Sequence, residues 1–221
     1  MLTKNIWKRG ISLLGAAAMT ASMLTGISFA EGETYTQPTL NPHSKSVLEV
    51  DGYQFIDLNG NGELDVYEDW RQDAETRAAD LVSQMTVREK IAQMQHPTYL
   101  PRADGKIAPY LKNYCSEYGI GMLLIRELNS VEAAATTMNT IQEYAESSRL
   151  GVPVLVSMDS VHGLSYVSGA TVTPHNLALA ATRDEALVTK LAEIARDEHL
   201  AVGVRMTLSP EADIASEPRW G

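Results

Sequence analysis

The stretch Gly-Val-Pro-Val-Leu-Val-Ser-Met-Asp, residues 151–159, is an apolar run that ends in a carboxylate. Similar apolar runs span residues 121–125 and 204–208. Amphipathic patterns between the three runs predict helices at 130–148 and 184–200. Strands that are apolar on both faces and alternate with helices are typical of a parallel sheet covered by helices. The order βαβαβ therefore predicts the α/β class.

Two α/β architectures share this order, the doubly wound sheet and the (β/α)₈ barrel. A glycine-rich phosphate-binding turn after the first strand would indicate a dinucleotide-binding fold. Residues 126–129 read Arg-Glu-Leu-Asn and offer no such turn. We therefore predict a partial (β/α)₈ TIM-type barrel of about three βα units. The chain stops at Gly221, directly after Trp220 in a proline-containing loop, so we expect a truncated barrel.

Two short helices are expected before the barrel. Apolar residues recur at helical spacing from Asp73 to Met85. Thr86, followed three residues later by Glu89, forms a capping box and predicts the start of a second helix.

Residues 57–68 match the calcium-binding loop of an EF-hand. The side chains or carbonyls of six residues supply the oxygen ligands in this pattern: Asp57, Asn59, Asn61, Glu63, Asp65 and Glu68. An Asn-Gly turn with solvated acids is the alternative, but such a turn needs neither Asp65 nor Glu68. The segment before the loop reads as extended and only its exit, at 69–71, looks helical. A single loop of this kind predicts a structural Ca²⁺ rather than a sensor.

The first thirty residues predict an exported protein. A basic start, an apolar stretch and Ser-Phe-Ala at 28–30 fit a cleaved signal peptide; a membrane anchor is the competing interpretation. Without residues 1–30 the chain has 15 basic and 28 acidic side chains. This balance disfavours nucleic acid and anionic membranes as partners and suits neutral sugars and divalent cations. Cys115 is the single cysteine, so no internal disulfide is expected.

Polar residues follow the predicted strands at their carboxyl ends, where the functional face of such a sheet lies. Arg126 follows the first strand, Asp159 the second, and Asp213 with Arg219 the third. Arg126 has a second interpretation, as a surface cap.

Two histidines, His162 and His175, lie in the loop after Asp159. They could serve as general bases or zinc ligands, but their spacing lacks a helical HExxH arrangement and no cysteine is near. We expect both to support the loop through hydrogen bonds to backbone carbonyls.

A series of motifs in one register resembles glycoside hydrolase family 3, over about residues 67–221. The motifs lie at 77–90, 151–154, 158–163, 169–171, 174–176, 181–184 and 218–221. The resemblance implies a (β/α)₈-type first domain, usually followed by an α/β sandwich. It also implies exo-acting hydrolysis of β-linked glucosides or xylosides with retention.

The resemblance gives Asp159 the role of clamping hydroxyls of the terminal sugar. The family's second clamp, its Lys-His pair, its nucleophile and its acid/base residue would all lie beyond Gly221. Retention needs two carboxyl groups about 5 Å apart. Asp159 with Glu211 or Asp213 is a conceivable pair, but the sequence fixes no separation. We therefore expect no catalytic residue within this chain, and no hydrolysis by the chain alone.

The sequence thus predicts four segments: a signal peptide at 1–30, a linker at 31–50, the EF-hand-like calcium loop and its lead-in at 51–72, and the amino-terminal part of the barrel domain at 73–221. An alternative function is a calcium-stabilised extracellular module that binds carbohydrate or another partner without catalysis. An arginine directly after Gly221 in the coding frame would favour the enzyme.

Overall fold

The computed structural model describes residues 34–102, 106–211, 216 and 219. The predicted signal peptide, Asp213 and most of the 218–221 motif lie outside the described residues. The chain divides into two units, 1–37 and 38–221, and all helices and strands described here belong to the second.

A β-hairpin formed by β1 (Val47–Val50) and β2 (Tyr53–Ile56) precedes the loop of residues 57–68. Asp51 and Gly52, at φ of 54° and 79°, connect the strands as an Asp-Gly turn. The last four residues of the predicted linker are therefore a strand. The strand agrees with the extended segment predicted before the 57–68 loop, so the predicted linker was four residues too long at this end.

The middle of the predicted linker is also tied to the fold. The backbone N–H groups of His43, Ser44 and Lys45 donate to the carboxylate of Glu146 at 2.9–3.0 Å. Burial raises the pKa of Glu146, but these three N–H groups outweigh burial and hold the pKa below its ordinary value. A polar segment is thus anchored through its backbone rather than through apolar side chains.

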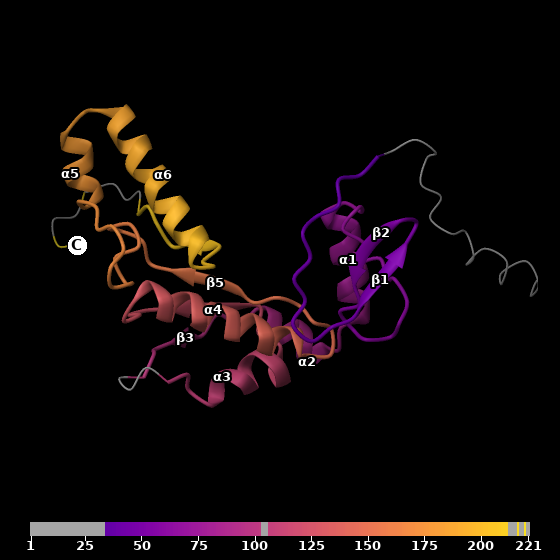
Figure 1. The fold of residues 1–221 in the computed structure, drawn as a ribbon. Coiled ribbons are helices and arrows are strands. Elements are labelled where there is room, and N and C mark those ends of the chain that lie inside the picture. Colours follow the sequence, from indigo (N-terminus) through magenta and orange to yellow (C-terminus); the bar gives the residue numbers. More distant parts are fainter. Residues whose placement is uncertain (1–33, 103–105, 212–215, 217–218, 220–221) are drawn as a thin grey trace, which may run out of the picture. The chain divides into compact units, whose positions relative to one another are not determined.

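The remaining elements follow in chain order. They are α1 (Ala74–Gln84), α2 (Val87–Gln93), β3 (Thr98–Tyr99), α3 (Tyr110–Lys112), the π-helix η1 (Asn113–Tyr118), β4 (Met122–Ile125), α4 (Val131–Glu146), β5 (Leu155–Met158), α5 (Asn176–Ala181), α6 (Glu185–Ala201) and β6 (Met206–Thr207). Figure 1 shows their arrangement.

Helix starts follow the capping residues in the sequence. Asp73, Ser130 and Asp184 each accept a backbone N–H at the N-terminus of a helix. Thr86 and Glu89 form the predicted capping box of α2. The two short helices before the sheet are confirmed.

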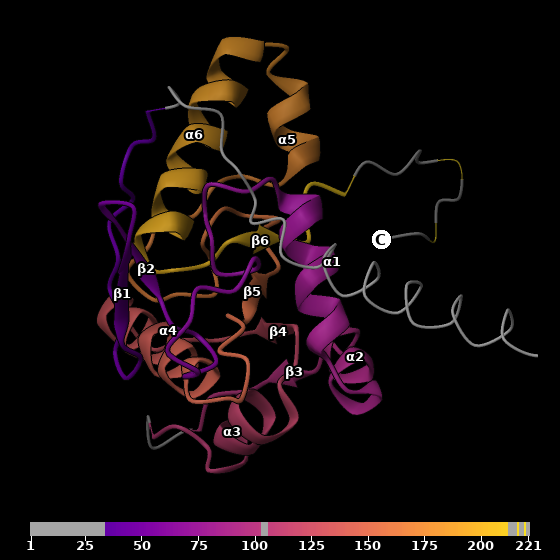
Figure 2. The same ribbon diagram turned by 90° about the vertical axis from the view of Figure 1, so that its right-hand side faces the viewer.

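Four parallel strands form one sheet in the order β3-β4-β5-β6, and Figure 2 labels all four. This confirms the α/β class with a parallel sheet. The sequence predicted three of these strands and missed β3, which has two residues and lies between Pro97 and Pro101. So short a segment carries no periodicity.

One face of the sheet carries most of the core. Leu123 and Ile125 of β4 and Val156 of β5 belong to the same buried cluster as Met138 and Ile141 of α4. Residues on the opposite face of β4 are less buried: Met122 and Leu124. Among the described residues, α3, η1 and α4 contribute to the covered side.

The exit from the 57–68 loop is also different from the prediction. Residues 66–68 and 70–71 form turns, and helix begins only at Ala74. Asp69 accounts for this, because its carboxylate binds the N–H and guanidinium of Arg71 and so stabilises a turn.

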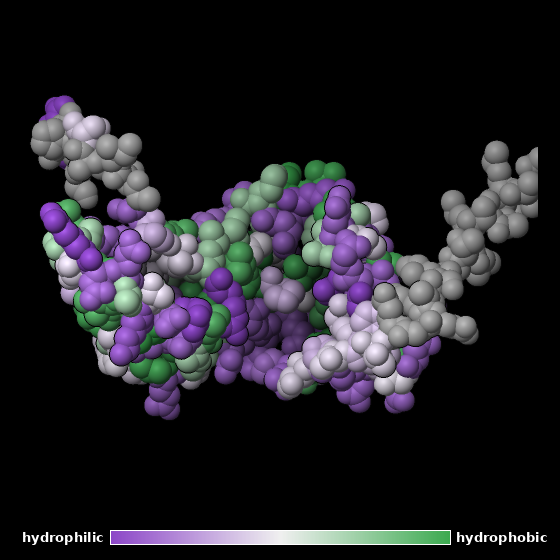
Figure 3. Space-filling model, turned by 90° about the horizontal axis from the view of Figure 1, so that it is seen from above, coloured by the Kyte–Doolittle hydropathy of each residue, from purple (hydrophilic) through white to green (hydrophobic). Residues whose placement is uncertain are grey.

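No helix in the described part of the chain is long and apolar enough to cross a membrane. The surface seen in Figure 3 is hollowed, and both hydrophilic and hydrophobic residues lie around the hollow.

Candidate functional site

Asp159 and Arg126 meet at the carboxyl ends of two adjacent strands. β4 and β5 are parallel with Leu124 opposite Ser157, so the residues two positions further on are neighbours. Arg126 Nη2 lies 2.5 Å from Asp159 Oδ2. The side chains are 44% and 21% exposed, so both groups can reach a ligand. The structure thus joins two residues that the sequence placed after separate strands.

The backbone bends sharply just after Arg126. Glu127 has φ of 58°, a left-handed conformation that costs a non-glycine residue about 1–2 kcal/mol. The bend directs Leu128 to the next loop, where its N–H donates to Tyr166 O at 2.7 Å and its carbonyl accepts from Ser168 N at 3.0 Å. The loops that follow β4 and β5 are therefore held together by their backbones.

His162 ties two ends of the 159–176 loop to each other. Its Nδ1 lies 3.0 Å from Thr173 O, and its carbonyl accepts from Thr173 N at 3.0 Å. Because a carbonyl can only accept, Nδ1 carries the proton in this contact. Gly163 follows with φ of 69°, and a Cβ there would lie 3.1 Å from Thr171 O. These contacts are of the kind expected for loop support.

His175 lies beside His162, with 5.3 Å between ring centroids and 60° between ring planes. Its side chain caps α5 by accepting from Leu177 N at 3.5 Å. The supporting role of both histidines stays a prediction. Asp213 lies outside the described residues, so the structure describes no distance between its carboxyl group and that of Asp159.

Within the 57–68 loop, backbone N–H groups point at the first carboxylate. Asp57 is 3% exposed and accepts from Gly60, Asn61 and Gly62 at 2.8–3.1 Å. Ser46 adds a hydroxyl donor from the residue before β1 at 3.1 Å. Asp57 is thus held in one orientation by its own loop.

The last carboxylate of the loop is held in the same way. Glu68 is 4% exposed and accepts from the N–H groups of Leu58, Asn59 and Asp65 at 2.7–3.2 Å. Burial raises the pKa of Glu68 above its ordinary value, and these N–H groups oppose the rise without cancelling it. A nearby cation would favour the ionised form of such a group.

The middle residues of the loop converge on one oxygen. Asn59 Nδ2 and Asn61 Nδ2 donate to Asp65 Oδ2 at 2.6 and 2.8 Å. In the described residues, no three His, Cys, Asp or Glu side chains form a group that could hold a metal ion. The donor set suits Ca²⁺ by its oxygen chemistry, provided that the two amides rotate to present oxygen and Glu63 adds its carbonyl.

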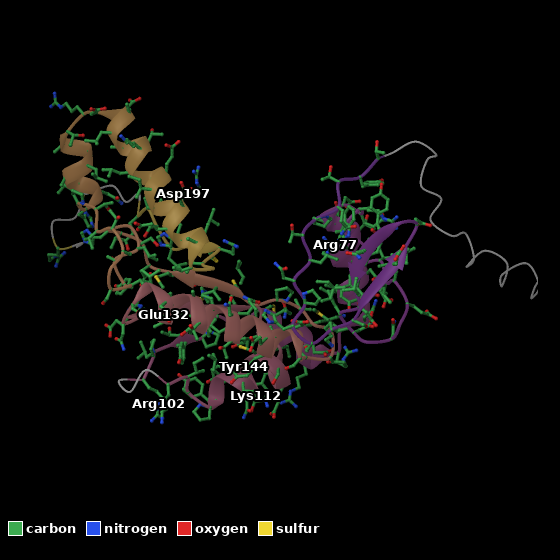
Figure 4. All side chains as sticks on the ribbon, in the orientation of Figure 1. Arg77, Arg102, Lys112, Glu132, Tyr144 and Asp197 are labelled. Carbon is green, nitrogen blue, oxygen red and sulfur yellow. The ribbon has the colours of Figure 1, made fainter. Side chains whose placement is uncertain are left out.

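The loop is packed against residues 150–151, in the connection between α4 and β5. Gly151 has φ of 60°, and a Cβ there would lie 2.7 Å from Leu58 O. The hydroxyl of Tyr67 donates to Leu150 O at 3.3 Å, and burial raises the pKa of this tyrosine. Arg77 of α1, labelled in Figure 4, donates to Tyr67 O at 3.0 Å. The loop therefore contacts the connection from α4 to β5 at residues 150–151.

The family model described as "Glycosyl hydrolase family 3 N terminal domain" matches residues 86–221. The chain belongs to glycosyl hydrolase family 3. This confirms the resemblance seen in the motifs, and it places β3 to β6 within the family's amino-terminal domain.

Relatives in family 3 include enzymes with different names. The chain is 38% identical over 200 residues to "Periplasmic beta-glucosidase/beta-xylosidase" of Dickeya chrysanthemi, covering 83% of this chain and 30% of that protein. It is 34% identical over 170 residues to "Beta-glucosidase C" of Emericella nidulans, covering 71% and 27%. The chain therefore spans less than a third of these relatives.

A solved family 3 structure has a similar fold. It is a β-N-acetylglucosaminidase from Paenibacillus sp. str. FPU-7, with a TM-score of 0.55 and 26% identity over 61% of this chain and 26% of that one.

The sequence left the role of Arg126 open because a charged residue after a strand is often only a surface residue. The register of β4 against β5 determines that Asp159 is the neighbour of Arg126. Two predicted strands in sequence order suggest adjacency, but only the register shows that Arg126 and Asp159 meet.

Proposed function

We propose that this chain is part of an exo-acting, retaining β-glucosidase-like enzyme that removes terminal β-D-glucosyl or xylosyl residues. The observation that carries the proposal is the place of Asp159, at the carboxyl end of a parallel strand within the segment that matches family 3. The names of two relatives support the substrate class. The fold proposed for the whole domain is a (β/α)₈ barrel of which this chain supplies the first strands.

In this proposal Asp159 binds the sugar, and the ion pair with Arg126 orients its carboxylate. A carboxylate accepts hydrogen bonds from two hydroxyl groups, and such charge-assisted bonds are roughly twice as strong as neutral ones. The adjacent guanidinium can donate to the same hydroxyls. The pair has no net charge, which suits a neutral sugar better than an acidic one.

The bond-breaking carboxyl groups belong, in this proposal, to the part of the protein after residue 221. The chain alone then binds sugar without hydrolysing it. Turnover of an aryl β-glucoside by the chain alone would contradict this division.

We also propose that the 57–68 loop binds one structural Ca²⁺ through Asp57, Asn59, Asn61, Glu63, Asp65 and Glu68. The spacing of the oxygen-bearing side chains and the two buried carboxylates, Asp57 and Glu68, at the ends of the loop support this role. Bound calcium would stabilise the loop and take no part in hydrolysis.

The proposed location is outside the cytoplasm, in the periplasm or the medium, after removal of residues 1–30. Two relatives are named as periplasmic β-glucosidases. The proposed partner is a carbohydrate, with neither nucleic acid nor membrane involved after cleavage.

The test is a titration of the chain with methyl β-D-glucoside and methyl β-D-xyloside, followed by ¹H–¹⁵N NMR. Asp159→Asn should weaken binding about tenfold or more, because it removes an ionised acceptor. Asp197→Asn is the matched control, since Asp197 is also paired with one arginine but lies on α6. Equal affinity of the chain and the Asp159 variant would refute the binding role of Asp159.

A further inference from the structure

A buried histidine that has no part in the proposed function lies next to the 159–176 loop. His199 is in the last turn of α6 and is 7% exposed. Its Nδ1 lies 2.6 Å from Ala195 O, and its Nε2 lies 2.6 Å from Ser160 Oγ. Ser160 directly follows Asp159.

The partners of the ring fix the direction of both hydrogen bonds. The carbonyl of Ala195 can only accept, so Nδ1 of His199 carries a proton. In the neutral ring Nε2 is then an acceptor, and the hydroxyl of Ser160 donates to it. The contact of the Ser160 hydroxyl with His199 at 2.6 Å is the shorter of its two contacts, since Met158 O lies 3.4 Å away.

Ser160 is also held through its backbone. Its N–H donates to Ser209 Oγ at 3.0 Å, from the segment after β6. Ser160, the residue after Asp159, is thus bonded to α6 and to the segment after β6, at sequence separations of 39 and 49 residues.

Charged groups near His199 in sequence have other partners. Glu198 accepts from the N–H and hydroxyl of Thr171 at 2.6–3.3 Å. Arg196 pairs with Asp197 at 2.8 Å. His199 is therefore placed to act through its hydrogen bond to Ser160.

We propose that Ser160 and His199 are positioning residues for Asp159. They fix the backbone just after the carboxylate, so that Asp159 keeps the orientation in which it meets Arg126 and a sugar. This inference rests on the proposed function for its effect on sugar binding. The tautomer of His199 does not depend on that function.

A second His–Ser pair in the same chain is a matched control. His96 Nε2 lies 2.6 Å from Ser157 Oγ, the same distance as in the first pair. Ser157 lies in β5, where the strand ladder already fixes the backbone. Removal of the Ser157 hydroxyl should lower the stability of the fold without changing the orientation of Asp159.

The experiment uses the full chain with Ser160→Ala, Ser160→Thr and Ser157→Ala. ¹⁵N NMR should show His199 protonated at Nδ1. Ser160→Ala should weaken binding of methyl β-D-glucoside about three- to tenfold, the loss of one ordinary hydrogen bond. Ser160→Thr keeps the hydroxyl and should restore the affinity, and Ser157→Ala should leave it unchanged.

Three results would overturn the inference while leaving the proposed function intact: a neutral His199 protonated only at Nε2, unchanged affinity in Ser160→Ala, or an equal loss in Ser157→Ala. Absence of sugar binding by the unsubstituted chain would overturn the proposed function, and with it the positioning role.

Discussion

The two polar loops of this protein hold their key carboxylates by different means. In the 57–68 loop, Asp57 and Glu68 accept N–H groups that belong to the same twelve-residue segment. In the 159–176 loop, Asp159 is paired with Arg126 on another strand. The first arrangement is specified locally and the second by the fold of the sheet.

This difference has a consequence for stability. The N–H contacts of the two carboxylates in the 57–68 loop span no more than ten residues of sequence. The site around Asp159 exists only when β4, β5 and α6 are in place, so any loss of register there removes the site.

The largest expected effect is at the contact between the 57–68 loop and the connection from α4 to β5. Gly151→Ala adds a Cβ 2.7 Å from Leu58 O at a φ of 60°, and should lower the free energy of unfolding by about 3 kcal/mol. Gly60→Ala has a φ of 75° but nothing within 4 Å, and should cost only about 1 kcal/mol. Urea denaturation measures both. Equal losses of unfolding free energy in the two variants would mean that the close approach of residue 151 to Leu58 does not matter for stability.

Calcium should have the next largest effect. At a concentration 100-fold above Kd, binding to the native state adds about 2.7 kcal/mol, which corresponds to about 5–10 °C in Tm for a chain of this size. Thermal unfolding with excess calcium and with a chelator measures the shift, and magnesium is the control ion. The same Tm in all three conditions would exclude a structural calcium site.

The smallest effect is expected at Glu89, which makes one local contact and one contact with a residue distant in sequence. Glu89 caps α2 through Thr86 and also binds Arg149 at 2.6 Å. Glu89→Gln keeps a side chain suited to the capping box and removes the ion pair, which should cost about 0.5–1 kcal/mol at neutral pH.

The pH dependence of this effect follows from the pKa of Glu89. The hydrogen bond from Arg149, opposed by burial, lowers that pKa from 4.5 to about 2. A lowered pKa means stability that is present above pH 4.5 and lost as the pH falls toward 2. The difference between the chain and Glu89→Gln should shrink over that range in urea denaturation. A difference that does not change with pH would rule out the ion pair as its source.

The parts of the fold that depend on local sequence were predictable. The capping box at Thr86 and the helices of the βα units involve residues within a few positions of each other. Strand β3 was missed because its two residues gain their structure from pairing with Leu124 and Ile125.

The site around Asp159 was predictable only in part. A carboxylate after an apolar strand and a family motif pointed to Asp159. Its contact with Arg126 depends on strand register, and the bond from Ser160 to His199 joins residues 39 positions apart. No local pattern encodes such distances.

The backbone bonds of Leu128 to Tyr166 and Ser168 matter for anyone who wishes to recombine this protein with its relatives. Because these bonds join the two loops, residues 126–128 and 159–176 are best exchanged together, along with the α6 residues Glu198 and His199 that bind the second loop. A chimera that exchanges only residues 159–176 would give Leu128 partners from the other protein. Exchange of both segments would keep the bonds of Leu128 to its own partners.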